Sequence, residues 1–91
     1  MIKITIEGFD FTPGGEREFK KLPLQIQKRI VDKTELWISS GEPLAFAKPL
    51  VNLPPATHRF RVGKYRICFY LQGSVIVIDG VDTREDAYRR R

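Results

Sequence analysis

The chain has 91 residues and a formal net charge of +5 at pH 7, with 42% hydrophobic and 30% charged residues. This composition is typical of one small globular domain, and it excludes a disordered chain, a membrane-spanning chain and a scaffold held by internal disulfides. No secretory signal is visible, so we expect a cytoplasmic protein with no membrane partner, whose residues 1–91 form a single domain.

The positive charge is concentrated in the C-terminal third of the chain. Residues 1–56 hold eight Lys/Arg against seven Asp/Glu, whereas residues 57–91 hold eight against four. Seven of these last eight basic residues are arginine, whose planar guanidinium suits phosphate better than the point charge of lysine. The asymmetry indicates either a nucleic acid or an acidic protein as partner.

The first third of the chain predicts one strand and one short helix. Residues 2–7 alternate isoleucine with polar side chains, which is typical of a strand with one buried face. Residues 8–15 carry three glycines and a proline, which predicts a connection containing only a turn at Gly14-Gly15. Residues 16–21 predict a short helix, with acidic side chains early and lysines late.

Residues 24–39 give the clearest helical pattern, with apolar side chains on one stripe. Trp37 lies on this stripe, so we interpret it as a core residue rather than a ligand platform. Gly41 is a candidate C-terminal cap. Residues 42–56 hold four prolines, which predicts an extended connection without a helix.

Residues 57–71 alternate side chains on both sides of Gly63-Lys64, and this pattern predicts a β-hairpin. A two-residue loop there predicts that Val62, Phe60 and His58 lie opposite Tyr65, Ile67 and Phe69 on an apolar side. On the other side, Arg61 would lie opposite Arg66, and Arg59 opposite Cys68. Facing like charges are unfavourable, so the arginines are solvated, paired with a carboxylate of a neighbouring strand, or bound to an anion.

A second turn at Gln72-Gly73 predicts a third strand over residues 74–79. In this register Ile76 lies opposite Phe69, and Asp79 lies opposite Arg66. The tail begins at Gly80. Within it, Arg84 and Tyr88 are four residues apart and share a face if the segment is helical.

The residue inventory excludes several kinds of site. One histidine and one cysteine cannot form a zinc site, and no phosphate loop or dinucleotide motif is present, so we expect no metal and no cofactor. We interpret Cys68 as a structural thiol and His58 as a packed histidine. Arginines and a tyrosine remain, and they can bind a phosphate and stabilise a phosphoryl transition state without metal. This predicted catalytic set is Arg59, Arg61, Arg66, Arg84 and Tyr88, with Lys64, Arg89 and Arg90 as further RNA or phosphate contacts.

The chain resembles the RelE/ParE superfamily of toxins from toxin–antitoxin pairs. Four segments carry the resemblance: Phe19-Lys-Lys-Leu22, Ile26-Gln-Lys-Arg-Ile30, Arg59-Phe-Arg-Val-Gly-Lys-Tyr-Arg66 and Thr83-Arg-Glu-Asp-Ala-Tyr88. The resemblance implies an α+β fold with an N-terminal strand, a two-helix hairpin, a three-stranded antiparallel meander that completes a twisted antiparallel sheet, and a short C-terminal segment.

The RelE branch implies a ribosome-dependent mRNA endoribonuclease, or mRNA interferase, that leaves a 2′,3′-cyclic phosphate and inhibits translation. The implied partners are a cognate antitoxin, the ribosome and mRNA, with operator DNA bound only through the antitoxin complex. Carried over by position, Arg66 and Arg84 would hold the scissile phosphate, and Tyr88 would orient the substrate.

The chain departs from the family pattern where Arg59 and Arg61 replace lysines of a well-studied RelE. Arginine does not lose its proton in proteins and is a poor general base, so the resemblance leaves the base without an assigned residue. Two alternatives therefore stay open. One is a non-enzymatic DNA gyrase inhibitor of the ParE branch, and the other is an inactive homologue that only binds its antitoxin.

Overall fold

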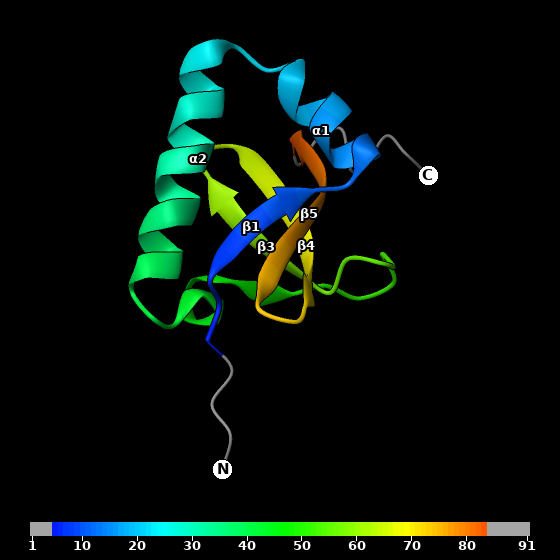
Figure 1. Cartoon of the computed structure of the whole chain (residues 1–91). Coiled ribbons are helices and arrows are strands. Elements are labelled where there is room, and N and C mark those ends of the chain that lie inside the picture. The colour runs from blue at the N-terminus through cyan, green and yellow to red at the C-terminus, as the bar shows by residue number, and fades with distance from the viewer. Residues whose placement is uncertain (1–4, 84–91) are drawn as a thin grey trace.

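The computed structural model describes residues 5–83, which form an α+β fold (Figure 1). Within these residues the strands form one five-stranded sheet in the order β1-β5-β4-β3-β2. The predicted fold class is confirmed, although β1 runs parallel to β5 and makes the sheet mixed. The elements are β1 (Gly8–Phe11), α1 (Pro13–Lys20), α2 (Leu24–Ser39), the 3-10 helix η1 (Pro43–Phe46), β2 (Lys48–Pro49), β3 (His58–Val62), β4 (Tyr65–Gln72) and β5 (Val75–Thr83).

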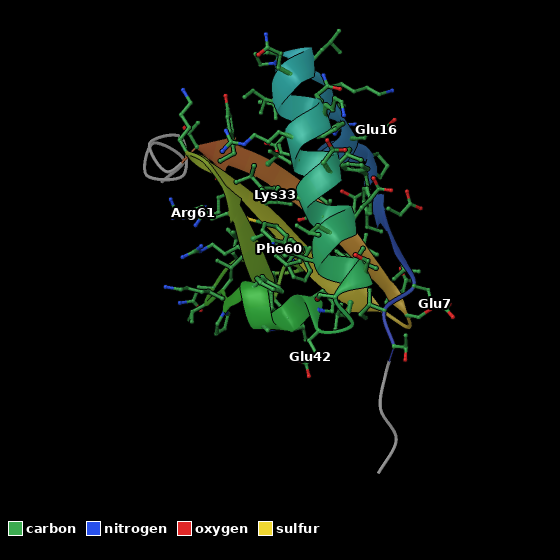
Figure 2. The ribbon with its side chains drawn as sticks, turned by 90° about the vertical axis from the view of Figure 1, so that its left-hand side faces the viewer. Glu7, Glu16, Lys33, Glu42, Phe60 and Arg61 are labelled. Carbon is green, nitrogen blue, oxygen red and sulfur yellow. The ribbon has the colours of Figure 1, made fainter. Side chains whose placement is uncertain are left out.

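Helix α2 packs on one face of the sheet, and the core lies between them (Figure 2). Ile30 of α2 and Phe60 of β3 are fully buried. The ring of Trp37 lies 4.6 Å from that of Phe60, which lies 4.5 Å from that of Phe69, measured between centroids. The interpretation of Trp37 as a core residue is therefore confirmed. The predicted bounds of this helix, residues 24–39, are also those observed.

The first strand lies later in the chain than predicted. The expectation was a strand over residues 2–7, but β1 covers Gly8–Phe11, residues 5–7 have no strand assignment, and residues 2–4 lie outside the described part of the chain. The reason is that Phe9 and Phe11 pack against the core while this segment pairs with β5. Ile6 is buried, so the predicted burial of its side chain is correct.

Helix α1 begins at Pro13 and includes Gly14 and Gly15, which the sequence assigned to a turn. Thr12 caps the helix because its Oγ1 accepts a hydrogen bond of 3.0 Å from the backbone N–H of Gly15. Proline is well suited to the first helical position that follows. Gly15 is required by packing, since a Cβ there would lie 2.3 Å from the carbonyl oxygen of Ile78. This contact sets α1 directly on β5.

The segment between α2 and the hairpin contains more structure than the expected extended connection. Gly41, with a φ of 84°, follows the C-terminal cap of α2. Pro43 then begins the short helix η1, because a proline is tolerated in the first turn. Lys48 and Pro49 form the edge strand β2, which pairs antiparallel with β3.

The predicted hairpin is confirmed in every pair. Val62 lies opposite Tyr65, Phe60 opposite Ile67, and His58 opposite Phe69 on the core side, while Arg61 faces Arg66 and Arg59 faces Cys68. Gly63 has a φ of 60°, which the two-residue hairpin loop requires and glycine readily adopts.

The register predicted for the third strand is wrong. The turn lies at Gly73-Ser74, one residue later than expected, and β5 continues to Thr83 rather than ending at Asp79. A register shift between Cys68 and Phe69 leaves Asp79 as an extra residue, so Asp82, not Asp79, faces Arg66. Among the described residues, no helix is long and apolar enough to cross a membrane.

Candidate nucleic-acid interface

The sheet face opposite α2, called here the outer face, carries the predicted arginines. Cα-paired residues on neighbouring strands place their side chains on the same side of a sheet. Two rows of partners therefore cross the outer face. One contains Lys48, Arg59, Cys68 and Gly80, and the other contains Arg61, Arg66 and Asp82.

Arg66 forms an ion pair on this face with Asp82 of the adjacent strand. Its Nε donates to Asp82 Oδ1 at 3.2 Å, and the two side chains are 21% and 5% exposed. The facing pair Arg61 and Arg66 is thus compensated by a carboxylate of the adjacent strand, which is one of the alternatives that the sequence left open. The contact orients the guanidinium of Arg66.

A pocket of about 220 Å³ lies beside this ion pair. Three carboxylates line it, so we call it the acidic pocket, and Arg66 and Cys68 line it as well. Asp79 Oδ1 accepts a hydrogen bond from Thr12 Oγ1 at 3.2 Å. The lining acidic residues are Glu18, Asp79 and Asp82.

Glu18 joins α1 to the irregular part of β5. Its Oε1 accepts a hydrogen bond of 3.0 Å from the backbone N–H of Val81. Gly80 makes room for this contact, because a Cβ there would lie 3.1 Å from Glu18 Oε1. The backbone thereby places a carboxylate from α1 in the same pocket as Arg66.

Cys68 is buried in the middle of the outer face. Burial raises the pKa of its thiol from 9.0 to about 11. The nearby Arg66 lowers this pKa, whereas the charges of Asp82, Glu18 and Asp79 raise it. The thiol is therefore protonated and unreactive at neutral pH, which agrees with the structural role predicted for it.

Among solved structures, the chain is similar to one in the toxin–antitoxin complex RelBE2 from Mycobacterium tuberculosis. The two chains are 31% identical, the match covers 90% of this chain and 95% of that one, and the TM-score is 0.71. This chain belongs to the RelE family of toxins.

Two archaeal structures have the same fold as this RelE-family chain. In the RelB–RelE antitoxin–toxin complex from Methanococcus jannaschii the identity is 26%, with 87% of this chain and 94% of that one covered and a TM-score of 0.66. In the RelE–RelB complex from Pyrococcus horikoshii the identity is 20%, with 88% and 96% covered and a TM-score of 0.65. No protein-family model and no curated protein sequence matches the chain.

The RelE fold brings together only part of the predicted site within the described residues. Arg59, Arg61 and Arg66 share the outer face. Lys64 lies in the hairpin loop, with its Nζ 5.6 Å from the centroid of the Tyr65 ring. His58 packs on the core side, 5.8 Å from the Phe69 ring between centroids, as interpreted. The remaining predicted residues, Arg84, Tyr88, Arg89 and Arg90, lie outside the described residues.

Three charged residues of this face were not predicted from the sequence. Lys48 reaches it through the pairing of β2 with β3, and Glu18 through the packing of α1 on β5. Asp82 reaches it through the later turn and the bulge. Their charge was visible, but no local pattern linked them to the hairpin. In the described part of this RelE-family chain, no group of three or more His, Cys, Asp or Glu side chains could hold a metal ion.

Proposed function

We propose that this RelE-family toxin is a ribosome-dependent mRNA endoribonuclease that acts in the cytoplasm and inhibits translation. The observation that carries the proposal is the alignment of Arg59, Arg61 and Arg66 on one face of the sheet, with Arg66 oriented by Asp82. An oriented guanidinium stabilises the charge that develops on a phosphorane oxygen better than a mobile one does.

The proposed reaction is an attack within the RNA strand. The 2′-oxygen bonds to the adjacent phosphorus as its proton passes to a base, the bond from phosphorus to the 5′-oxygen breaks, and that oxygen takes a proton from water. The hydroxide that this leaves is neutralised by the proton held on the base. The products are a 2′,3′-cyclic phosphate and a 5′-hydroxyl end. Arg66 and Arg84 are proposed to neutralise the phosphate, and Tyr88 to orient the substrate.

Glu18 is the proposed acceptor of the 2′-hydroxyl proton. It lines the same pocket as Arg66, its side chain is partly exposed, and the backbone N–H of Val81 donates a hydrogen bond to its Oε1. Asp82, by contrast, has a side chain that is only 5% exposed. A carboxylate held beside the phosphate-binding arginine can act where a lysine base is absent.

The proposed protein partner is a cognate antitoxin, because the similar solved chains come from RelB–RelE complexes. Several large apolar side chains are exposed on this chain and are suited to a covering partner. They are Leu24 and Leu36 on α2, Leu44 and Phe46 on η1, and Val51 and Leu53 after β2. Ribosome and mRNA are the proposed targets, and operator DNA would be bound only through the antitoxin complex.

Primer extension on mRNA from cells expressing the toxin tests this proposal. We expect new cleavage sites within reading frames for the wild type and for Lys33→Ala, an exposed lysine of α2 that serves as control. We expect these sites to weaken by about 10²-fold or more in Glu18→Gln, which keeps an acceptor for the Val81 N–H but cannot take a proton. Arg61→Ala and Arg84→Ala should weaken them as well. A wild-type pattern identical to that of uninduced cells would contradict the proposal.

One observation favours a second candidate, a non-enzymatic gyrase inhibitor of the ParE branch. The positions where a well-studied RelE carries lysines are Arg59 and Arg61, which cannot act as bases. This candidate predicts inhibition of supercoiling by purified gyrase and trapped gyrase–DNA complexes. A normal supercoiling rate at saturating toxin would eliminate it.

A further inference from the structure

Strand β2 adds a cation to the outer face that the hairpin alone does not predict. Lys48 pairs with Arg59, so its side chain lies on the same side of the sheet as Arg59 and Arg61. Lys48 and Arg61 are exposed, and Arg59 is partly exposed. In Figure 2 Arg61 extends from the strands on the side away from α2. We call Lys48, Arg59 and Arg61 the basic edge.

Among residues 5–83, charge on the outer face changes sign from this edge towards β5. The acidic pocket holds the carboxylates of Glu18, Asp79 and Asp82, and Arg66, which pairs with Asp82, is the one cation among the described residues that line it. A polyanion is attracted by the basic edge and repelled by the opposite half of the face. The electrostatic field therefore runs across the sheet from the basic edge to the acidic pocket, and Arg66 lies at the boundary between these two halves.

The spacing of the basic edge suits successive phosphates of a single strand. Arg59 and Arg61 are two residues apart on one strand, which is about 6.6 Å, and Lys48 is one strand away from Arg59, which is about 4.8 Å between backbones. Lys48 and Arg61 are exposed and Arg59 is partly exposed, and long side chains at these spacings can each reach a separate phosphate. A row of cations that follows a backbone is the usual electrostatic component of single-strand binding.

We propose that the backbone of single-stranded RNA follows the β2–β3 edge and that Lys48 binds one of its phosphates. This inference rests on the proposed function, and it extends the interface to a strand that carries none of the predicted site residues. The carboxylates of the acidic pocket keep the strand on this side, so that the scissile phosphate lies at the boundary residue Arg66.

A lysine on an edge strand has a common alternative role, which is to block pairing with strands of other molecules. A substitution separates the two roles. Lys48→Glu keeps a charged side chain on the edge and still blocks strand addition, but it places a negative charge among the phosphate-binding residues. Its molecular mass in solution should therefore be unchanged while its RNA affinity falls.

The experiment measures binding of a fluorescent 2′-O-methyl single-stranded RNA, which lacks the attacking hydroxyl, by anisotropy over about 50 to 200 mM salt. We expect Lys48→Ala to lower the slope of log K against log salt by about 0.7, the value for one phosphate contact on a single strand. Lys48→Glu should lower affinity further. The matched variants Lys33→Ala and Lys33→Glu, on α2, should leave the slope unchanged, because screening limits the effect of a distant charge. Asp79→Asn, which keeps an acceptor for Thr12, should increase affinity.

Two results would overturn the inference. One is a slope for Lys48→Ala equal to that of Lys33→Ala, and the other is weaker binding of the cognate antitoxin, but not of RNA, in Lys48→Ala. The second result would make the basic edge an antitoxin surface. The probe cannot be cleaved, so the binding experiment does not depend on nuclease activity. If the wild type binds this RNA but cleaves no mRNA in cells, the nuclease proposal is rejected and the proposed RNA binding by the basic edge is retained.

Discussion

At the residue scale, the outer face depends on how single charges are paired. Arg66 and Asp82 lie on adjacent strands and are 21% and 5% exposed. Each of these two charges depends on the other in this position, because a single charge would lose its hydration without gaining an opposite charge in return. The same carboxylate, together with burial, contributes to the high pKa of the neighbouring Cys68 thiol.

Arg66→Ala should destabilise the fold by roughly 3 kcal/mol, since it leaves the buried carboxylate of Asp82 without its cation. Urea unfolding of both proteins measures this loss. The double variant Arg66→Met/Asp82→Leu removes both charges and should recover most of the stability. A loss below about 0.5 kcal/mol for Arg66→Ala, the range of ordinary surface substitutions, would show that Asp82 does not need Arg66.

Cys68 should make the stability of the protein fall between about pH 9 and pH 11. The pKa of its thiol is raised to about 11 in the folded protein from 9.0, so folding favours the protonated thiol. The contribution is complete below pH 9 and is lost as the pH rises towards 11. The difference in unfolding free energy between the wild type and Cys68→Ala, measured in urea at pH 8 and pH 10.5, isolates it from other titrating groups. A difference that does not change with pH would contradict the raised pKa.

At the element scale, α1 and β5 form a tightly packed unit that determines which carboxylates reach the outer face. Gly15 lies against the backbone of Ile78, Thr12 Oγ1 donates to Asp79, and Glu18 accepts from the N–H of Val81. Each contact lies at or next to the register irregularity of β5. The irregularity and the helix therefore stabilise one another, and together they line the acidic pocket.

Gly15→Ala should destabilise the protein by about 1–3 kcal/mol, because the new Cβ would lie 2.3 Å from the backbone oxygen of Ile78 and would displace α1 from β5. Gly14→Ala is the matched control in the same helical turn. Its Cβ would meet only the end of the Arg17 side chain, at 3.7 Å, and it should be neutral or stabilising by up to about 1 kcal/mol. Thermal denaturation of the two variants compares them directly. Equal effects of the two substitutions would mean that α1 does not need the close approach.

At the scale of the whole molecule, one core supports two different sheet faces. The face under α2 is apolar and fully buried at Phe60, Ile67 and Phe69. The outer face is divided into a basic edge and an acidic pocket. Because the edge comes from β2 and β3 and the carboxylates of the pocket come from α1 and β5, the charge gradient is a property of the assembled sheet rather than of any one segment.

Local patterns of the sequence determined the elements whose partners are near in the chain. Alternation around Gly63-Lys64 was sufficient for the full hairpin register, since a two-residue loop leaves no freedom in pairing. The stripe over residues 24–39 likewise determined α2. The same alternation of side chains predicts that Arg59, Arg61 and Arg66 lie on one face of the hairpin.

Tertiary structure decided which residues from distant parts of the chain meet on the outer face. The turn at Gly73-Ser74 and the bulge at Asp79 place Asp82 opposite Arg66, and the packing of α1 on β5 brings in Glu18. The pairing of β2 with β3 brings in Lys48. No local periodicity encodes these contacts, because they depend on the packing of whole elements against the core and on one residue inserted in a strand. The sequence of residues 57–71 by itself therefore predicts a basic hairpin. Only the fold places this hairpin beside the acidic pocket, so that the outer face has a basic half and an acidic half.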